Sequence, residues 1–136
     1  MKPYVLIVDD VGTNLAIAEE QLKDDFDVCL SSSGEEALQW LNTLRFDAVL
    51  MDYEMPGLNG IQTVEEMNKL PGCNKIPVIF LSGAKAKEIM AQAQERGLAN
   101  VVGFMGKPFD KSALTSLINN NIQNSPEPEP EPDMDI

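Results

Sequence analysis

Five residues with side chains suited to bind metal or phosphate follow four apolar segments of the sequence. Asp9 and Asp10 come directly after "YVLIV", and Asp52 comes directly after "DAVLM". Ser82 follows "IPVIFL", and Lys107 comes two residues after "NVVGFM". A charge at the end of an apolar strand costs solvation free energy unless it has a partner. The recurrence of such groups at strand ends therefore predicts a shared site.

The chemistry of this set points to a metal ion and a phosphoryl group. Two carboxylates about 4 Å apart repel by about 4 kcal/mol at an effective dielectric constant near 20, so three together need a cation. An all-oxygen site suits Mg²⁺, which often shares its ligands with a phosphoryl group. A lysine and a hydroxyl can bind the remaining phosphoryl oxygens. An ionised carboxylate needs no base to be a nucleophile. Asp52 is the candidate nucleophile because it ends the central strand and is expected to face the metal.

The elements that must position these residues are strands that alternate with amphipathic helices. This alternation predicts an α/β fold, with a doubly wound, five-stranded parallel sheet covered by helices on both faces. Ligands of such sheets bind at the carboxyl ends of the strands. The expected strands are 4–8, 26–30, 47–51, 76–81 and 100–105, and the expected helices are 14–25, 33–44, 60–70, 86–97 and 110–122.

Several helix ends carry their own signals. Ser33 is a candidate N-cap, and Glu36, three residues later, is expected to complete a capping box. Gly97 is expected to end the helix over 86–97. Asp110 is expected to cap the last helix.

Four motifs in order resemble the receiver domain of two-component response regulators. They are "VDD" (8–10), "MDYEMPGLNG" (51–60), "FLSGA" (80–84) and "GKPF" (106–109), and the likeness covers residues 4 to about 122. The resemblance implies a flavodoxin-like (βα)5 fold with strand order 2-1-3-4-5. It also implies a phosphorylatable signalling switch rather than an enzyme that turns over a separate substrate, with self-catalysed phosphotransfer and autodephosphorylation as its only chemistry.

The resemblance also implies the metal and acceptor residues. Asp52 is implied as the phosphoacceptor and Asp10 as the direct Mg²⁺ ligand. Asp9 is implied to act largely through water. The backbone carbonyl of Glu54 is implied to complete the protein ligands, in a loop shaped by the turn from Pro56 to Gly60.

The remaining roles implied by the resemblance belong to the phosphoryl group and to the switch. Lys107 is implied as the phosphate partner, before a cis peptide bond at Pro108. Ser82 is implied as the switch hydroxyl. Phe104 stands at the position of the rotating aromatic residue, and the alternative for Phe104 is a plain core aromatic.

The sequence contains no histidine, which excludes phosphoryl transfer from a histidine within the chain. We therefore expect the donor to be a histidine kinase, a histidine phosphotransfer protein or a small acyl phosphate. Leu15 and Ile17 are candidate contacts for a donor protein, although Leu15 could equally belong to the core. After phosphorylation, the expected partner is an effector protein or a second copy of the chain, bound at the face formed by 86–97, 100–105 and 110–122.

Composition bounds the class of protein. The 136 residues carry a net charge of −12, and the Pro-Glu segment 125–136 contributes five acids and no base. This change in composition predicts a domain boundary near residue 124: the domain that resembles a receiver spans 1–124, and a disordered acidic tail or the start of a linker follows over 125–136. The remaining 17 acids and 10 bases give no basic surface for nucleic acid.

No apolar run is long enough to span a membrane, and no signal peptide is evident, so we expect a cytoplasmic protein with Cys29 and Cys73 as free thiols.

Three alternatives remain open at this point. The chain could be the receiver module of a larger regulator or hybrid kinase, cut at its linker. It could be an aspartyl-phosphate phosphatase with Glu54 as general acid, although the usual glycine-threonine pair and cap insertion are missing. It could be a flavin-binding module of the same sheet order, although Asp9 and Asp10 would repel a flavin phosphate.

Overall fold

The computed structural model describes residues 2–82 and 85–124. Within them a single sheet of five parallel strands has the order β2-β1-β3-β4-β5, and five α-helices cover it, as the sequence predicts. The strands are β1 (Tyr4–Val8), β2 (Asp27–Ser31), β3 (Ala48–Asp52), β4 (Val78–Ser82) and β5 (Val101–Gly106). The helices are α1 (Gly12–Leu22), α2 (Gly34–Thr43), α3 (Gly60–Met67), α4 (Ala86–Glu95) and α5 (Lys111–Asn124), with a short 3₁₀ turn, η1, at Cys73–Lys75.

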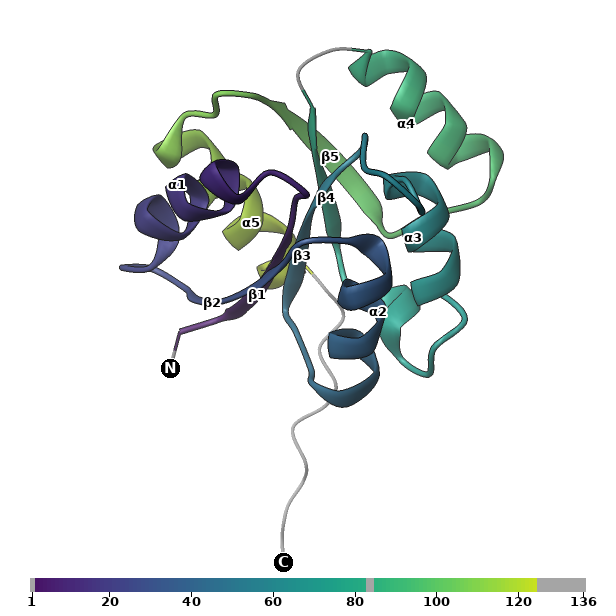
Figure 1. Cartoon of the computed structure of the whole chain (residues 1–136), viewed down its shortest axis with the longest axis horizontal. Helices are drawn as coiled ribbons and strands as arrows, with labels where there is room; N and C mark the ends of the chain where they lie inside the picture. Colours follow the sequence, from purple (N-terminus) through teal and green to yellow (C-terminus); the bar gives the residue numbers. More distant parts are fainter. Residues whose placement is uncertain (1, 83–84, 125–136) are drawn as a thin grey trace, which may run out of the picture.

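The helices form two layers, one on each face of the sheet (Figure 1). Helices α1 and α5 pack on one face, and α2, α3 and α4 pack on the other. Alternate residues of the central strands serve the two cores: Val5 and Ile7 of β1 face α1 and α5, whereas Leu6 and Val8 face the opposite layer. The strands therefore read as continuous apolar runs because they are buried on both sides.

Element boundaries differ from the predicted ones by a few residues. Strand β4 begins at Val78 rather than at residue 76, because Pro77 has no N–H to donate and contributes only its carbonyl, which accepts from Val49. Helix α1 begins at Gly12 and ends at Leu22, before the helix-disfavouring pair Asp24 and Asp25. No helix of the described residues has both the length and the apolar character that crossing a membrane requires.

The predicted caps are present, with one correction. The Ser33 hydroxyl accepts from the backbone N–H of Glu36 at 3.0 Å. The Glu36 carboxylate, however, accepts from the backbone N–H of Ser32 at 2.8 Å, so the predicted reciprocal bond to Ser33 is wrong. The complete capping box is formed by Asn59 and Gln62 at the start of α3.

The Asp110 carboxylate accepts from the backbone N–H of Ala113 at 2.8 Å, as a cap of α5 should. Gly97 has a φ of +69°, which suits the predicted end of α4. The free thiols expected at Cys29 and Cys73 are also confirmed.

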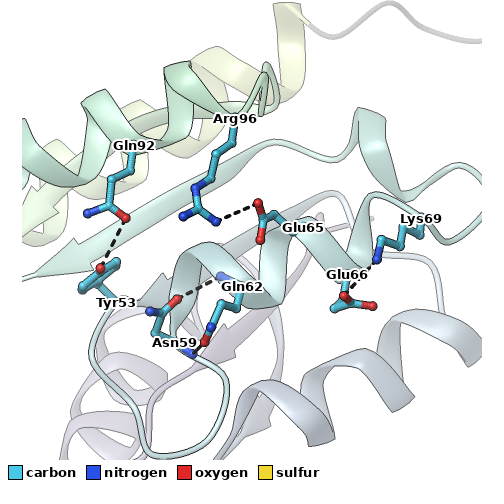
Figure 2. Close-up of polar contacts among 8 residues, drawn as sticks. All are labelled: Tyr53, Asn59, Gln62, Glu65, Glu66, Lys69, Gln92 and Arg96. Carbon is cyan, nitrogen blue, oxygen red and sulfur yellow. Dashed lines mark hydrogen bonds and ion pairs between the residues drawn. The ribbon is translucent and has the colours of Figure 1, made fainter.

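Two polar contacts join α4 to the elements beside it (Figure 2). The Arg96 guanidinium lies 2.9 Å from the Glu65 carboxylate of α3. The Tyr53 hydroxyl, just after β3, donates to the side-chain oxygen of Gln92 at 3.5 Å. The hydrogen bond from Tyr53 to Gln92 connects the residue that follows Asp52 with α4.

The Arg96–Glu65 pair is expected to contribute little to stability. Both side chains are partly exposed, so solvent and salt screen their attraction. A double-mutant cycle of Arg96→Ala and Glu65→Ala, measured by urea denaturation, should give a coupling free energy of about 0.2–1 kcal/mol. The exposed pair of Glu66, in α3, and Lys69, just after α3, is the matched control, and a coupling well above 1 kcal/mol for Arg96–Glu65 would contradict this expectation.

Candidate functional site

The polar residues predicted at strand ends meet at one edge of the sheet. Asp9 comes immediately after β1, and Asp52 and Ser82 are the last residues of β3 and β4. Lys107 comes immediately after β5. Because the strands are parallel, these carboxyl ends lie along the same edge.

The Lys107 ammonium joins the ends of β1 and β3. Its Nζ atom lies 2.9 Å from Oδ2 of Asp9 and 3.2 Å from Oδ1 of Asp52. The two acids are 98 and 55 residues away from Lys107 in the sequence, so only the fold brings them together. The peptide bond between Lys107 and Pro108 is cis, as expected.

Three carboxylates lie side by side at this edge. Asp9, Asp10 and Asp52 each offer an oxygen atom, and these atoms all lie within 4.8 Å of one another. Asp9 and Asp52 are buried, whereas Asp10 is exposed. The donors are all oxygen and one side stands open to solvent, which fits a hydrated hard cation such as Mg²⁺.

The electrostatics of the site are unbalanced without a cation. Burial, followed by repulsion from Asp9, raises the pKa of Asp52 from an ordinary 3.8 to about 6, against the opposing attraction of Lys107. Burial alone would lower the pKa of Lys107. Its hydrogen bond to Asp9 and its attraction to Asp52 outweigh burial, so the pKa of Lys107 is raised. The ammonium therefore stays charged, while the Asp52 carboxylate is left in an unfavourable environment.

The loop after β3 is tightly packed against the strand end. The Gly60 N–H donates to the Tyr53 carbonyl at 2.8 Å. A Cβ atom at Gly60 would lie 2.8 Å from the Asp52 carbonyl oxygen and 2.7 Å from the Phe80 ring. Glu35 of α2 accepts from the Leu58 N–H at 3.3 Å and so holds the outer part of the loop. Glycine at position 60 is thus a steric requirement of the site.

Comparison with known proteins decides the family. A sequence profile of the response regulator receiver domain matches residues 5–119. This chain belongs to the receiver domain family. Family membership favours the signalling role over the phosphatase and flavin-module alternatives.

Receiver domains of this kind occur in larger curated relatives. The chain is 32% identical over 118 residues to "Probable transcriptional regulator ycf29" of Pyropia yezoensis, covering 87% of this chain and 52% of that protein. It is 33% identical over 116 residues to "Signal transduction histidine-protein kinase BarA" of Escherichia coli, covering 84% of this chain and 12% of that protein. The chain thus spans about half the length, or less, of these relatives.

Solved structures show the same fold. A putative response regulator from Chloroflexus aurantiacus has a TM-score of 0.82 at 26% identity, covering 91% of this chain and all of that one. The receiver domain of the sensor histidine kinase PA1611 from Pseudomonas aeruginosa has a TM-score of 0.76 at 25% identity, covering 91% of this chain and 100% of that one. That structure was solved with a magnesium ion coordinated in its active site cleft.

Two predicted switch residues of this receiver domain lie on β4 and β5. Ser82 follows Leu81, which pairs with Asp52 across the sheet, so the hydroxyl-bearing residue lies next to the strand that carries Asp52. Phe104 pairs with Phe80 in register, yet its side chain is 43% exposed. The alternative of a plain core aromatic is therefore wrong for Phe104, and its switching role stays a prediction.

The two candidate donor contacts on α1, Leu15 and Ile17, differ in their exposure to solvent. Leu15 is buried in the core between α1, α5 and the sheet, whereas Ile17 is 53% exposed. Beside the acids, Ile17 lines a small hollow of about 90 Å³ together with Asn14, Lys107 and Phe109. An exposed apolar side chain thus borders the site.

Sequence reasoning missed one residue that reaches the acids. The Asn14 side-chain amide donates to Oδ2 of Asp9 at 3.2 Å. Asn14 does not follow a predicted strand, so the pattern of polar residues at strand ends does not include it. The available signal was an amide side chain in the first turn of the helix that follows the acidic pair.

Proposed function

We propose that Asp52 accepts a phosphoryl group from a phosphohistidine of another protein, with Mg²⁺ bound beside it. The observation that carries this proposal is the Lys107 ammonium, held between Asp9 and Asp52 at one corner of a three-carboxylate cluster. If Lys107 only formed ion pairs with Asp9 and Asp52, the third carboxylate of the cluster, Asp10, would not be needed. A metal site alone would not need a cationic side chain within hydrogen-bond distance of a proposed ligand.

The transfer step uses groups that the chain already places. A carboxylate oxygen of Asp52 attacks phosphorus, the O–P bond forms, and the N–P bond to the donor histidine breaks. The imidazole nitrogen keeps the bonding electron pair and is released neutral or takes a proton from water. Lys107 moves little, because its ammonium already touches Asp52 and can bind an oxygen of the arriving phosphoryl group.

The cation has proposed ligands in this chain. Asp10 and Asp52 would bind it directly, the backbone carbonyl of Glu54 would complete the protein ligands, and Asp9 would act mainly through water. When bound, Mg²⁺ neutralises charge on the carboxylates and on the transferring phosphoryl oxygens.

The donor is proposed to be a histidine kinase or a histidine phosphotransfer protein. The chain has no histidine of its own to carry the phosphoryl group. Ile17 and the hollow next to Lys107 offer an apolar contact within reach of Asp52. In this proposal the protein acts in the cytoplasm, as a switch whose only chemistry is phosphotransfer to itself and loss of that group.

The output is proposed to pass through the face made by α4, β5 and α5. Val102 and Phe104 of β5 expose apolar side chains, 37% and 43% accessible respectively. Ser82, at the end of β4, and Phe104, on β5, are the proposed switch residues that change this face, and an effector protein or a second copy of the chain is the proposed partner. The proposed receiver domain ends at residue 124, and the predicted acidic segment 125–136 lies outside the described residues.

Incubation with acetyl phosphate and Mg²⁺ tests the proposal directly. Intact-protein mass spectrometry should show one added phosphoryl group on the wild type and on Asp25→Asn, an exposed control. The Asp52→Asn variant should show none. Removal of Mg²⁺ with EDTA should abolish the addition. A wild type that stays unmodified with acetyl phosphate, phosphoramidate and a phosphorylated histidine phosphotransfer protein would refute the proposed function.

A further inference from the structure

The Asp9 carboxylate is held by three donors from its own chain. Its Oδ1 accepts from the backbone N–H of Val11 at 2.9 Å. Its Oδ2 accepts from Lys107 at 2.9 Å and from the Asn14 amide at 3.2 Å. Both oxygens are therefore engaged, and Asp9 is only 2% exposed.

The three carboxylates of the site are consequently not equivalent. Asp10 is exposed and can turn toward a hydrated cation. Asp52 accepts a hydrogen bond from Lys107 through Oδ1. Asp9 is fixed in orientation by groups on opposite sides of it. Its structural position suits an anchor for the ammonium better than a mobile metal ligand.

Asn14 is well placed for this task. It lies in the first turn of α1, whose N-cap residue, Val11, has no side-chain acceptor or donor to offer. From this turn, the Asn14 amide reaches back to Oδ2 of Asp9. Asn14 also lines the same hollow as Lys107, so the two donors approach Oδ2 from one side.

We propose that Asn14 is a positioning residue that holds the Asp9 carboxylate as the acceptor for Lys107 and so keeps the ammonium between Asp9 and Asp52. This inference rests on the proposed function only for its kinetic consequence. Without the amide, Asp9 can rotate about its side-chain bonds. Lys107, a flexible side chain with three donors, then loses its fixed second partner.

Chemical labelling of the metal-free protein tests the positioning itself. Full-length wild type, Asn14→Ala and Asn14→Gln would be treated with limiting acetic anhydride, and acetylation of each lysine would be measured by mass spectrometry. Lys75, which is exposed, is the internal reference. Lys107 should react about threefold faster or more in Asn14→Ala than in the wild type, because a hydrogen bond that fixes its partner is lost. Asn14→Gln keeps an amide donor and should restore most of the protection.

A second pair of measurements separates positioning from metal binding. At saturating Mg²⁺, phosphorylation of Asn14→Ala by acetyl phosphate should be about fivefold to tenfold slower, because Lys107 is misplaced. The Mg²⁺ dissociation constant from calorimetry should stay within about twofold of the wild type, because the proposed direct ligands are untouched. The control is Thr13→Ala, an exposed neighbour in the same helical turn, which should change neither quantity.

The outcomes discriminate between the two proposals. Equal reactivity of Lys107 in Asn14→Ala and wild type would overturn the inference, as would an equal increase in Thr13→Ala. A parallel loss of Mg²⁺ affinity and urea stability in Asn14→Ala would also overturn it, because that is the signature of general disruption. If Lys107 becomes more reactive while the wild type is never phosphorylated, the positioning role stands and the proposed function falls.

Discussion

In the absence of divalent metal, Asp52→Asn is expected to stabilise the folded protein by about 1–2 kcal/mol at pH 7.5. The folded state raises the pKa of Asp52 to about 6, mainly through burial and then through repulsion from Asp9. A shift of about two units corresponds to roughly 3 kcal/mol of unfavourable ionisation. Asparagine has nearly the same shape and carries no charge. We expect only part of the 3 kcal/mol to be recovered, because the contact of Asp52 with Lys107 is weakened as well.

The difference in stability between Asp52→Asn and the wild type should depend on pH, because the two proteins differ in one titratable group. Between about pH 4 and pH 6 the folded protein holds a proton on Asp52 that the unfolded chain has already released. Ionisation of Asp52 therefore lowers stability as the pH rises through this window, and the full cost is present above pH 6. The advantage of Asp52→Asn over the wild type should shrink steadily as the pH falls from 7 to 4. Urea denaturation of both proteins in EDTA, at several pH values, measures it.

Addition of Mg²⁺ should reduce or reverse the stability advantage of Asp52→Asn over the wild type. A cation among Asp9, Asp10 and Asp52 would favour the ionised form of Asp52, so the wild type should gain stability with Mg²⁺ concentration by mass action. Asp52→Asn lacks one of the proposed carboxylate ligands and should gain less. The exposed variant Asp25→Asn should follow the wild type throughout. A metal-free Asp52→Asn protein that is less stable than the wild type at pH 7.5 would show that the Lys107 contact dominates at this site.

Gly60→Ala is expected to destabilise the protein by about 2–3 kcal/mol. The added Cβ would lie 2.7 Å from the Phe80 ring, 2.8 Å from the Asp52 carbonyl oxygen and 3.0 Å from the Tyr53 Cα atom. Two of these three neighbours are backbone atoms at the end of β3, which the sheet holds in place. Relief of the clash must therefore move either the start of α3 or the strand that carries Asp52. The loss of stability should come with slower phosphorylation by acetyl phosphate.

Gly12→Ala is the matched control, because Gly12 is the first residue of α1 as Gly60 is of α3. A Cβ at Gly12 meets no atom within 4 Å, and its backbone needs no positive φ. Alanine has the higher helix propensity, so the free energy of unfolding should stay the same or rise by a few tenths of a kcal/mol. Equal urea midpoints for Gly60→Ala and Gly12→Ala would contradict the steric account of position 60.

The strand ends could be predicted from sequence because their pattern is a property of the chain itself. Five apolar runs alternate with helical periodicity, and parallel strands bring their carboxyl ends to one edge. Asp9, Asp52, Ser82 and Lys107 each follow such a run closely, so their neighbourhood follows from topology alone. Four ordered motifs then gave the family without any coordinates.

The remaining features depend on side-chain geometry that periodicity does not contain. Glu36 can reach either Ser32 or Ser33, and only the path of the chain between β2 and α2 selects Ser32. An aromatic residue inside an apolar strand could equally be a core residue, but β5 is an edge strand and Phe104 on it is partly exposed. Asn14 contacts Asp9 through a turn of helix rather than through a strand end.

Both ends of the described chain lie at the edge of the sheet opposite the acids. Lys2 and Pro3, which lead into β1, share a broad hollow with Ile122 near the end of α5, and the first residue of β2, Asp27, borders it too. The acids and Lys107 lie at the opposite, carboxyl ends of the parallel strands, a full strand length away. Such a domain is a portable unit: a neighbour spliced to either end, or a host loop that receives both, leaves the edge that carries the acids uncovered. The same geometry makes a circular permutant joined between residues 2 and 124 a natural engineering format for reporters of the proposed phosphorylation of Asp52.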